Sequence, residues 1–365
     1  MKFYILDREF NSLKLVDYFT SVIWTDRYCD VGEFDIRTPV DSDILQYAKR
    51  DYYIWSSESD RLMIIEDLII QTDVVQGNQF QIRGRSLESI LDRRILWEQT
   101  QFDDTLENVI KKALDENIIS PKISDRKIPN FIFQYSNDSD IAALKHKEQM
   151  TGDNLLDMVK ELCGMHDLGF KITLNEENKF VFQLFKGIDR SYNQDENPYV
   201  TFSTKKENII NSNYLESTLN YRNVALVAGE DLTVGEEGKR KTLAVGSGKG
   251  LDRRELFVDA RDIQSEKEGT DGEKYTDEEY NELLAQRGKK KLSERKFEQL
   301  FDGEIEATQL HVYGKDFFLG DVVQVINEYA IEAVTRITEV ALSISPTETT
   351  YLPTFSVVTE DENES

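Results

Sequence analysis

A period-two alternation near the start of the chain constrains its fold more than any other feature. In the stretch W-T-D-R-Y-C-D-V-G-E-F-D-I-R-T, residues 24 to 38, Phe34 and Ile36 fall on one side of an extended backbone. Glu33 and Arg37 fall on the other side, together with the aspartate between them. Because successive side chains of a strand point to opposite faces, the pattern predicts a β-strand with one buried face and one face in water.

Short apolar runs of this kind recur through residues 1 to 97. Polar breaks separate them, and many short strands at close spacing predict a small antiparallel barrel or sandwich. A short helix over residues 86 to 94 is expected to close this first β-barrel domain. The runs are F-Y-I-L, V-I-W-T, F-D-I-R, Y-Y-I-W, R-L-M-I-I-E, D-L-I-I-Q-T and Q-F-Q-I-R.

Residues 98 to 198 predict a mixed α+β domain. Helical spacing of apolar residues begins behind Asp104, which is followed three residues later by Glu107, as at a helix N-terminus. A second amphipathic helix is predicted from Asp153. Alternation on both sides of a polar turn predicts a β-hairpin over residues 169 to 185.

Residues 199 to 350 predict a second antiparallel β-barrel domain with a helical insertion over about 261 to 302. Thr276 and Glu279 have the spacing of a capping box, and the apolar stripe behind them runs to about Phe301. The strands between 199 and 260 are assigned to this barrel. The stretches G-E-E-G-K-R-K and G-S-G-K-G are interpreted as exposed hairpin tips.

The predicted fold class is therefore α+β and predominantly β. Two small antiparallel β-barrel domains bracket the mixed α+β domain, and the second barrel carries the helical insertion. Residues 351 to 365, which end in E-D-E-N-E-S, are predicted to form an acidic C-terminal tail.

The charge balance limits the kinds of partner. The chain has 69 acidic and 44 basic residues, a formal net charge of −25. Such a surface repels nucleic-acid phosphates and anionic lipid headgroups, so binding to either is disfavoured. The charge has two interpretations: a soluble acidic surface, or an acidic wall of a passage through which DNA slides without sticking.

Cysteine usage and hydropathy indicate synthesis in the cytosol. Cys29 and Cys163, the two cysteines, fall in a strand pattern and on an apolar helix face, so a disulfide framework is not expected. The apolar run after Met1 is too short for a signal peptide, and no segment approaches the length of a membrane span.

Gly246, Gly248, Lys249 and Gly250 resemble a phosphate-binding loop only superficially. That motif needs a glycine five residues before its final glycine and a hydroxyl residue after its lysine. Leu243 and Gly250 occupy those two positions. No nucleotide site is predicted here.

Cys163 and His166 are spaced like half of a zinc site. The other histidines are His146 and His311, and no second cysteine pair completes a tetrahedral set. A buried, apolar Cys163 is the preferred interpretation.

Three acidic clusters have the composition of paired carboxylates or calcium ligands. They are Asp103 with Asp104, residues 137 to 140 and residues 277 to 279. Helix capping accounts for the first and third, and none has calcium-loop spacing. Asp321, in L-G-D-V-V, is predicted to be a turn carboxylate that accepts from backbone amides.

A further charged group, Arg253, Arg254 and residues 259 to 262, has two interpretations. Its members either pair across a subunit contact or form a solvated edge that discourages strand aggregation.

The sequence predicts no catalytic, cofactor-binding or metal-binding residues. It contains neither G-x-S-x-G nor H-E-x-x-H. A glycoside-hydrolase acid and base pair stays open, because the separation of such carboxylates is a three-dimensional quantity. The chain is predicted not to be an enzyme.

Several strings along the chain carry a family resemblance. They are I-L-D-R-E-F to G-E-F-D-I in the opening segment, N-V-A-L-V-A-G-E at 223 to 230, R-R-E-L-F-V-D-A-R-D-I at 253 to 263 and F-L-G-D-V-V at 318 to 323. In order and spacing the chain resembles the tail-hub family of siphophages, which is related in architecture to the baseplate hub of contractile-tailed phages.

The resemblance implies a structural role in the virion, at the tail tip, after assembly in the host cytoplasm. It implies a homotrimer whose two similar barrels per chain make a ring of six, adapting a sixfold tail tube to a threefold tip around the DNA-ejection channel. The implied partners are the tail tube or distal tail protein and tail-tip or receptor-binding proteins, with DNA only in transit and no membrane insertion.

Two other function classes are retained. The loops around 235 to 250 and 264 to 276 could make the chain a binding module that recognises a host surface glycan or carries the receptor-binding protein. The third class is a cell-wall hydrolase, for which the sequence offers no motif.

Overall fold

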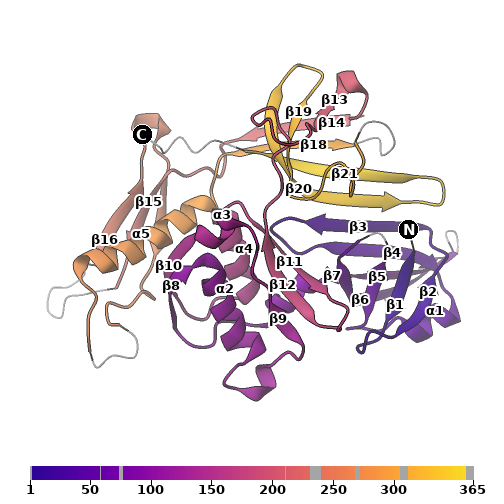
Figure 1. Ribbon diagram of the computed structural model, residues 1–365, viewed down its shortest axis with the longest axis horizontal. Coiled ribbons are helices and arrows are strands. Elements are labelled where there is room, and N and C mark those ends of the chain that lie inside the picture. Colours follow the sequence, from indigo (N-terminus) through magenta and orange to yellow (C-terminus); the bar gives the residue numbers. More distant parts are fainter. Residues whose placement is uncertain are drawn as a thin grey trace.

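The predicted alternating strand is present in the computed structural model, which describes residues 2–57, 59–73, 77–209, 211–230, 240–267, 272–304 and 311–358 (Figure 1). Strand β3 (Ser21–Arg27) pairs antiparallel with β4 (Glu33–Pro39). Phe34 and Ile36 are buried, whereas Glu33 and Arg37 are exposed. The predicted strand and its two faces are confirmed.

The N-terminal strands form an antiparallel run around one core. They follow the order β3-β4-β7-β6-β5-β1-β2, and their buried faces share a core that includes Trp24, Phe34 and Phe80. The remaining elements of this segment are β1 (Phe3–Leu6), β2 (Ser12–Val16), α1 (Ser42–Tyr47), β5 (Tyr53–Ser56), β6 (Leu62–Asp73), β7 (Gly77–Ser86) and the 3-10 helix Leu87–Arg93.

The C-terminal strands build a second core, which includes Phe202, Phe301, Val323 and Phe355. Strand β20 is its long central member and pairs with β19 and β21. The strands are β13 (Thr201–Ser203), β14 (Asn211–Ser217), β18 (Glu298–Glu304), β19 (Val322–Ile326), β20 (Glu332–Ile344) and β21 (Thr349–Val357).

The two groups of strands are fused into one open sheet, so the predicted two-barrel architecture is not confirmed. The second half of β20 pairs with β3, from Glu339 opposite Arg27 to Ile344 opposite Val22. The described strands make a 13-stranded sheet whose main path ends in β14 and β2, with β19 and β13 branching from β20, and the sheet does not close on itself. A register shift between Ile337 and Glu339 bends β20 between its β19 and β3 partners.

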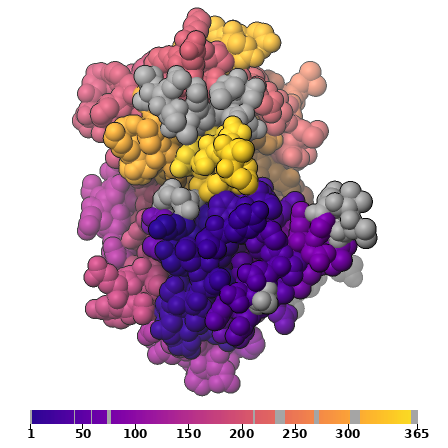
Figure 2. All heavy atoms as spheres, turned by 90° about the vertical axis from the view of Figure 1, so that its right-hand side faces the viewer, coloured from indigo at the N-terminus to yellow at the C-terminus, as the bar shows by residue number. Residues whose placement is uncertain are grey.

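This fusion joins an N-terminal strand to a C-terminal strand. Figure 1 shows β3 directly beneath β20 and β21. In the side view of Figure 2, the indigo N-terminal residues lie against the yellow C-terminal strands. A pairing between residues more than 300 positions apart leaves no local sequence signal.

The segment between β14 and β18 forms a separate layer, which corrects the assignment of its strands to the second barrel. Its three-stranded sheet has the order β16-β15-β17 and pairs with no other described strand. Ala225 and Val227 of this sheet pack with Leu283 and Leu284 of α5, so the layer buries its own core. The elements are β15 (Val224–Ala228), β16 (Thr242–Gly246), β17 (Glu255–Asp259) and α5 (Asp277–Ser293).

Helix α5 has the predicted start but ends earlier than predicted. Thr276 and Glu279 form the capping box. The helix ends at Ser293 rather than near Phe301, because the residues from Glu298 onward form β18, which pairs with β14 and β21. Gly288 does not interrupt α5.

The central α+β unit contains both predicted helices and the predicted hairpin. Helix α2 is capped by Thr105 and helix α4 by Asn154, one residue later than the predicted Asp104 and Asp153. Strands β11 and β12 pair antiparallel as predicted. The elements are β8 (Thr100–Thr105), α2 (Leu106–Leu114), the π-helical turn Asp115–Ile119, the 3-10 turn Ser124–Arg126, β9 (Phe131–Phe133), α3 (Ser139–Ala143), β10 (Lys145–Met150), α4 (Leu155–Met165), β11 (Gly169–Leu174) and β12 (Phe180–Phe185).

The predicted acidic tail begins later than residue 351, since β21 extends to Val357 and pairs with β20. Residues 359 to 365, which include E-D-E-N-E-S, lie outside the described residues, as do residues 235 to 239 of one predicted hairpin tip. The domain boundaries at 97, 198 and 350 stay predictions. No helix in the described part of the chain is long and apolar enough to cross a membrane.

Candidate functional site

The glycine-rich stretch from 246 to 250 packs against its own chain. Gly246 has φ of +88°, and a Cβ there would lie 2.1 Å from the carbonyl oxygen of Asn223. A Cβ at Gly248 would lie 2.8 Å from Asn223 Nδ2. The stretch leads through one 3-10 turn, Gly250–Asp252, into β17, not into the helix of a phosphate loop. Close packing accounts for Gly246 and Gly248, and Gly250 has a left-handed φ of +56°.

The histidines do not gather around Cys163. His146 of β10 is buried, with Nε2 3.1 Å from the Glu148 carboxylate, and its ring centroid is 6.4 Å from that of His166. His311 instead accepts from a backbone amide of β13. Among the described residues, no three His, Cys, Asp or Glu side chains are placed to hold a metal ion. Cys163 is fully buried in α4, as predicted.

Two of the acidic clusters contain helix caps. Asp138 accepts from the amide of Asp140 at the start of α3, at 2.8 Å. Thr276 accepts from the Glu279 amide, and the Glu279 carboxylate accepts from the Thr276 amide, at 3.2 and 2.8 Å. Asp104 accepts from Asn108 Nδ2 beside the cap of α2. The capping interpretation is confirmed for the third cluster, Thr105 rather than Asp104 caps α2, and the cap at Asp138 was not predicted.

Asp321 is a buried turn carboxylate, as predicted. It accepts from the amides of Ile188 and Phe318 at 2.8 and 3.0 Å. It also pairs with Arg190 Nε at 2.8 Å. The carboxylate thereby fastens the segment that follows β12 to the start of β19.

The charged group around β17 pairs within the chain. Arg253 contacts Glu255 at 2.5 Å, and Asp259 contacts both Arg240 and Arg261 at 2.6 Å. Hydrogen bonds from Arg261, and then from Arg240, lower the pKa of Asp259 to about 2. The subunit contact considered for this group stays a prediction.

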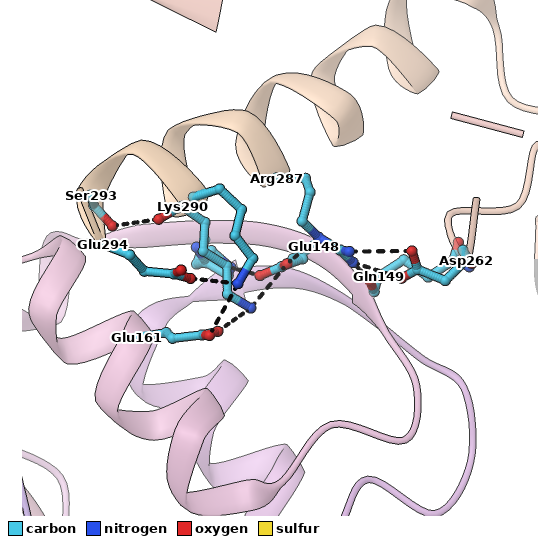
Figure 3. Close-up of polar contacts among 10 residues, drawn as sticks. Glu148, Gln149, Glu161, Asp262, Arg287, Lys290, Ser293 and Glu294 are labelled. Carbon is cyan, nitrogen blue, oxygen red and sulfur yellow. Dashed lines mark hydrogen bonds and ion pairs between the residues drawn. The ribbon is translucent and has the colours of Figure 1, made fainter. Parts of the chain in front are cut away.

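A set of charges that the sequence did not predict, with buried Glu148 and Lys290 at its centre, joins α5 to the central unit. We call Glu148, Glu161, Asp262, Arg287 and Lys290 the junction cluster. Figure 3 shows Arg287 and Lys290 reaching from α5 toward Glu148. Arg287 Nε and Lys290 Nζ lie 3.2 and 3.3 Å from Glu148 Oε1.

The other two carboxylates of the junction cluster pair with the same two cations. Lys290 also pairs with Glu161 of α4 at 2.5 Å, and Arg287 pairs with Asp262 at 2.8 Å. Burial raises the pKa of Glu148, but His146, Lys290 and Arg287 outweigh burial and lower it to about 2. Glu148 is therefore ionised at neutral pH although its side chain is 1% exposed.

The sequence held one signal of this cluster. Lys290 lies seven residues after Leu283, on the apolar stripe of α5, and this spacing predicts that its side chain faces inward. A lysine at such a position requires a buried carboxylate. The spacing identifies Lys290 but gives no indication that Glu148, 142 residues away, is its partner.

A second buried ion pair joins the N-terminal sheet to the β11–β12 hairpin. Arg61 Nη1 and the Glu88 carboxylate are in contact, with side chains 3% and 0% exposed. Glu88 also accepts from the Ile172 amide of β11 at 2.9 Å. Burial is the main cause that raises the pKa of neighbouring Asp26 to about 6, with Asp60 and Glu88 adding to it against the opposing effect of Arg61.

Two surface depressions in the described part of the chain, of about 80 and 610 Å³, are lined by residues of the N-terminal segment between Arg8 and Arg93 and not by the buried charges. The buried pairs instead connect elements that are distant in sequence. Their arrangement is suited to fixing one unit on another.

Comparison with protein families gives one match over nearly the whole chain. The model of the family described as Siphovirus ReqiPepy6 Gp37-like protein matches residues 2–355. No curated protein sequence matches the chain.

Solved structures of phage tail proteins have a similar fold at low sequence identity. The 43 kDa tail protein of prophage MuSo2 from Shewanella oneidensis is 11% identical with a TM-score of 0.60, and the alignment covers 97% of this chain and 98% of that one. The tail protein from Neisseria meningitidis MC58 is 13% identical with a TM-score of 0.54, covering 98% and 95%. Prophage tail protein gp18 from Listeria monocytogenes EGD-e is 14% identical with a TM-score of 0.52, covering 100% and 96%.

Proposed function

Because the chain belongs to the family of Siphovirus ReqiPepy6 Gp37-like proteins and has the fold of phage tail proteins, we propose that it is the structural hub at the distal end of a siphophage tail. Three copies form a ring that adapts the sixfold tail tube to a threefold tip and encloses the DNA-ejection channel. The family match over residues 2–355 is the observation that carries the proposal.

The open sheet supports assembly through unlike surfaces. Its outer strands, β2 and β14, each have one pairing partner among the described residues. Strands that end a sheet offer unpaired backbone groups to a neighbouring chain. A ring of identical chains requires two different patches that meet head to tail. The ends at β2 and β14 are candidates for those patches.

The buried charge pairs support a role that requires stiffness. A channel wall must keep its units in fixed relative positions while tail partners pull on them. Ion pairs such as Glu148 with Lys290 are disrupted only if uncompensated charge is left buried, so they resist relative motion of the units they join.

Electron microscopy of the purified protein, alone and mixed with the neighbouring tail-tube and tail-tip proteins, tests the proposal. We expect a threefold ring with a central opening. A preparation that stays monomeric in every mixture would contradict the hub assignment.

The retained alternatives have separate tests. Binding of host cells or glycans that is lost when the loops around 235 to 250 or 264 to 276 are shortened would favour a binding module. Clearing of cell-wall material in a zymogram would favour a hydrolase. We expect neither result.

A further inference from the structure

The two cysteines of the chain, 134 positions apart in sequence, meet at the contact between the N-terminal sheet and α4. Cys29 Sγ lies 3.4 Å from the Lys160 carbonyl oxygen and 4.0 Å from the position of a Cβ on Gly164. Residues 160, 163 and 164 share one face of a helix, because they are three or four positions apart. Cys29 therefore lies over the turn that carries Cys163, and it packs against the hydrophobic core that contains Cys163.

Contacts on both sides of Cys29 hold it over the helix. The Tyr28 hydroxyl donates to the Asp167 carbonyl oxygen at 2.9 Å. Asp30 pairs with Lys160 Nζ at 2.7 Å. The segment from 28 to 30 is thus fastened to α4 and to the residues just after it.

The two thiols differ in their access to reagents. Cys29 is partly exposed, whereas Cys163 is fully buried. Burial, and then the neighbouring Cys29 thiol, raises the pKa of Cys163. The thiolate is the species that attacks a disulfide reagent. Because Cys29 is the more exposed thiol and Cys163 has the raised pKa, a reagent in solution reacts first with Cys29.

We propose that Cys29 and Cys163 form a thiol–disulfide pair, which a small-molecule disulfide oxidises to a covalent link between the segment after β3 and α4. The Cys29 thiolate attacks one sulfur of oxidised glutathione and releases one glutathione thiolate. Cys163 then loses its proton and attacks the Cys29 sulfur, releasing the second glutathione.

In the balanced reaction, two cysteine thiols and one oxidised glutathione give one protein disulfide and two glutathione thiols. Two electrons pass from the cysteines to glutathione, and its two sulfurs take up the two protons. The attack of Cys163 on the mixed disulfide is the slower step, because the raised pKa of Cys163 keeps the population of its thiolate low. The pair is reduced in a reducing compartment and oxidises after transfer to an oxidising one.

Intact-mass measurement of the native protein tests the pair directly. The full chain is incubated with oxidised glutathione at mildly alkaline pH, unfolded and treated with maleimide. We expect loss of two hydrogens, no maleimide adduct, and a cross-linked peptide that contains both cysteines. Thermal unfolding should shift upward, on the order of 5 °C, and the shift should disappear with a reducing agent.

Two variants separate the steps. Cys163→Ala should stop at a stable glutathione adduct on Cys29, and Cys29→Ser should leave Cys163 unmodified in the native state. In the wild-type protein, two maleimide-reactive thiols after prolonged oxidation, or a lasting glutathione adduct, would overturn the proposal. So would a disulfide between chains. None of these outcomes depends on whether the protein forms a ring.

Discussion

At the scale of single residues, the charges that matter most are buried between units rather than gathered in a cavity. Glu148 accepts from three cationic or imidazole groups. Because the folded-state pKa of Glu148 is depressed, its contribution to stability is complete above the unfolded pKa of about 4.5 and is lost as pH falls toward 2.

Replacing Glu148 should destabilise the fold. We expect Glu148→Ala to lower the free energy of unfolding by about 2–4 kcal/mol, since Arg287 and Lys290 keep Asp262 and Glu161 but lose their shared carboxylate. The exposed pair of Glu98 with Lys122 provides the control, and Glu98→Ala should cost no more than about 1 kcal/mol. Equal losses for the two variants, measured by denaturant unfolding, would refute the role of the cluster.

Asp26 predicts the opposite dependence on pH. Its folded pKa, about 6, lies above the ordinary value of 3.8 for an aspartate, so the stability of the fold decreases as pH rises from about 4 to 6. Asp26→Asn removes an unfavourable buried charge above that range. The substitution should raise the free energy of unfolding by no more than about 3 kcal/mol. Partial exposure of the Asp26 side chain reduces this gain.

Thermal unfolding of this variant and wild type at two pH values checks the effect. The Tm advantage of Asp26→Asn should be clear at pH 7.5 and should shrink at pH 4. An equal loss of stability at both pH values would show that a hydrogen bond of Asp26 outweighs the cost of its charge.

At the scale of elements, the local sequence pattern predicted those strands and helix ends that contacts between nearby residues determine. Alternation identified β4 and the β11–β12 hairpin, and spacing identified the capping box of α5. The helix caps at Thr105 and Asn154 were missed by one residue, because each follows an aspartate with the same capping chemistry. Leu300 and Phe301 continued an apolar helical stripe, but their partners in β14 and β21 make them part of a strand.

Gly288 illustrates an element-scale constraint. A Cβ there would lie 2.8 and 2.9 Å from methyl groups of Val245 and Val227, so a glycine lets α5 approach its sheet closely. Gly288→Ala should slow the packing of α5 on β15 and β16 during refolding, and it should speed hydrogen exchange in α5. These effects are expected even though alanine favours a helix by about 1 kcal/mol relative to glycine. Lys289→Ala, at the next and exposed position, is the control. Unchanged exchange in Gly288→Ala would contradict the close packing.

At the scale of the whole molecule, the family was recognisable from the sequence, and the family comparison confirms that resemblance. The arrangement of the strands into sheets could not be predicted from the sequence. Short strands predicted two separate barrels, whereas β3 and β20 join the two groups in one open sheet. The junction cluster was also beyond prediction, because only the packing of α5 on β10 decides that Glu148 and Lys290 are buried together.

The charge of the whole chain predicts weak contact with DNA. At a net charge of −25, we expect no shift of duplex DNA in an electrophoretic assay at about 0.15 M salt. An assembled ring should behave in the same way, as a conduit for DNA requires. A salt-dependent complex at micromolar protein would contradict an acidic channel wall.

The mass of the purified particle in solution tests the central claim most directly. Light scattering coupled to size exclusion, with the protein alone and with neighbouring tail proteins, should give a homotrimeric species of about 127 kDa, three times the 42.3 kDa chain. A single species of one chain mass under all these conditions would contradict the hub account.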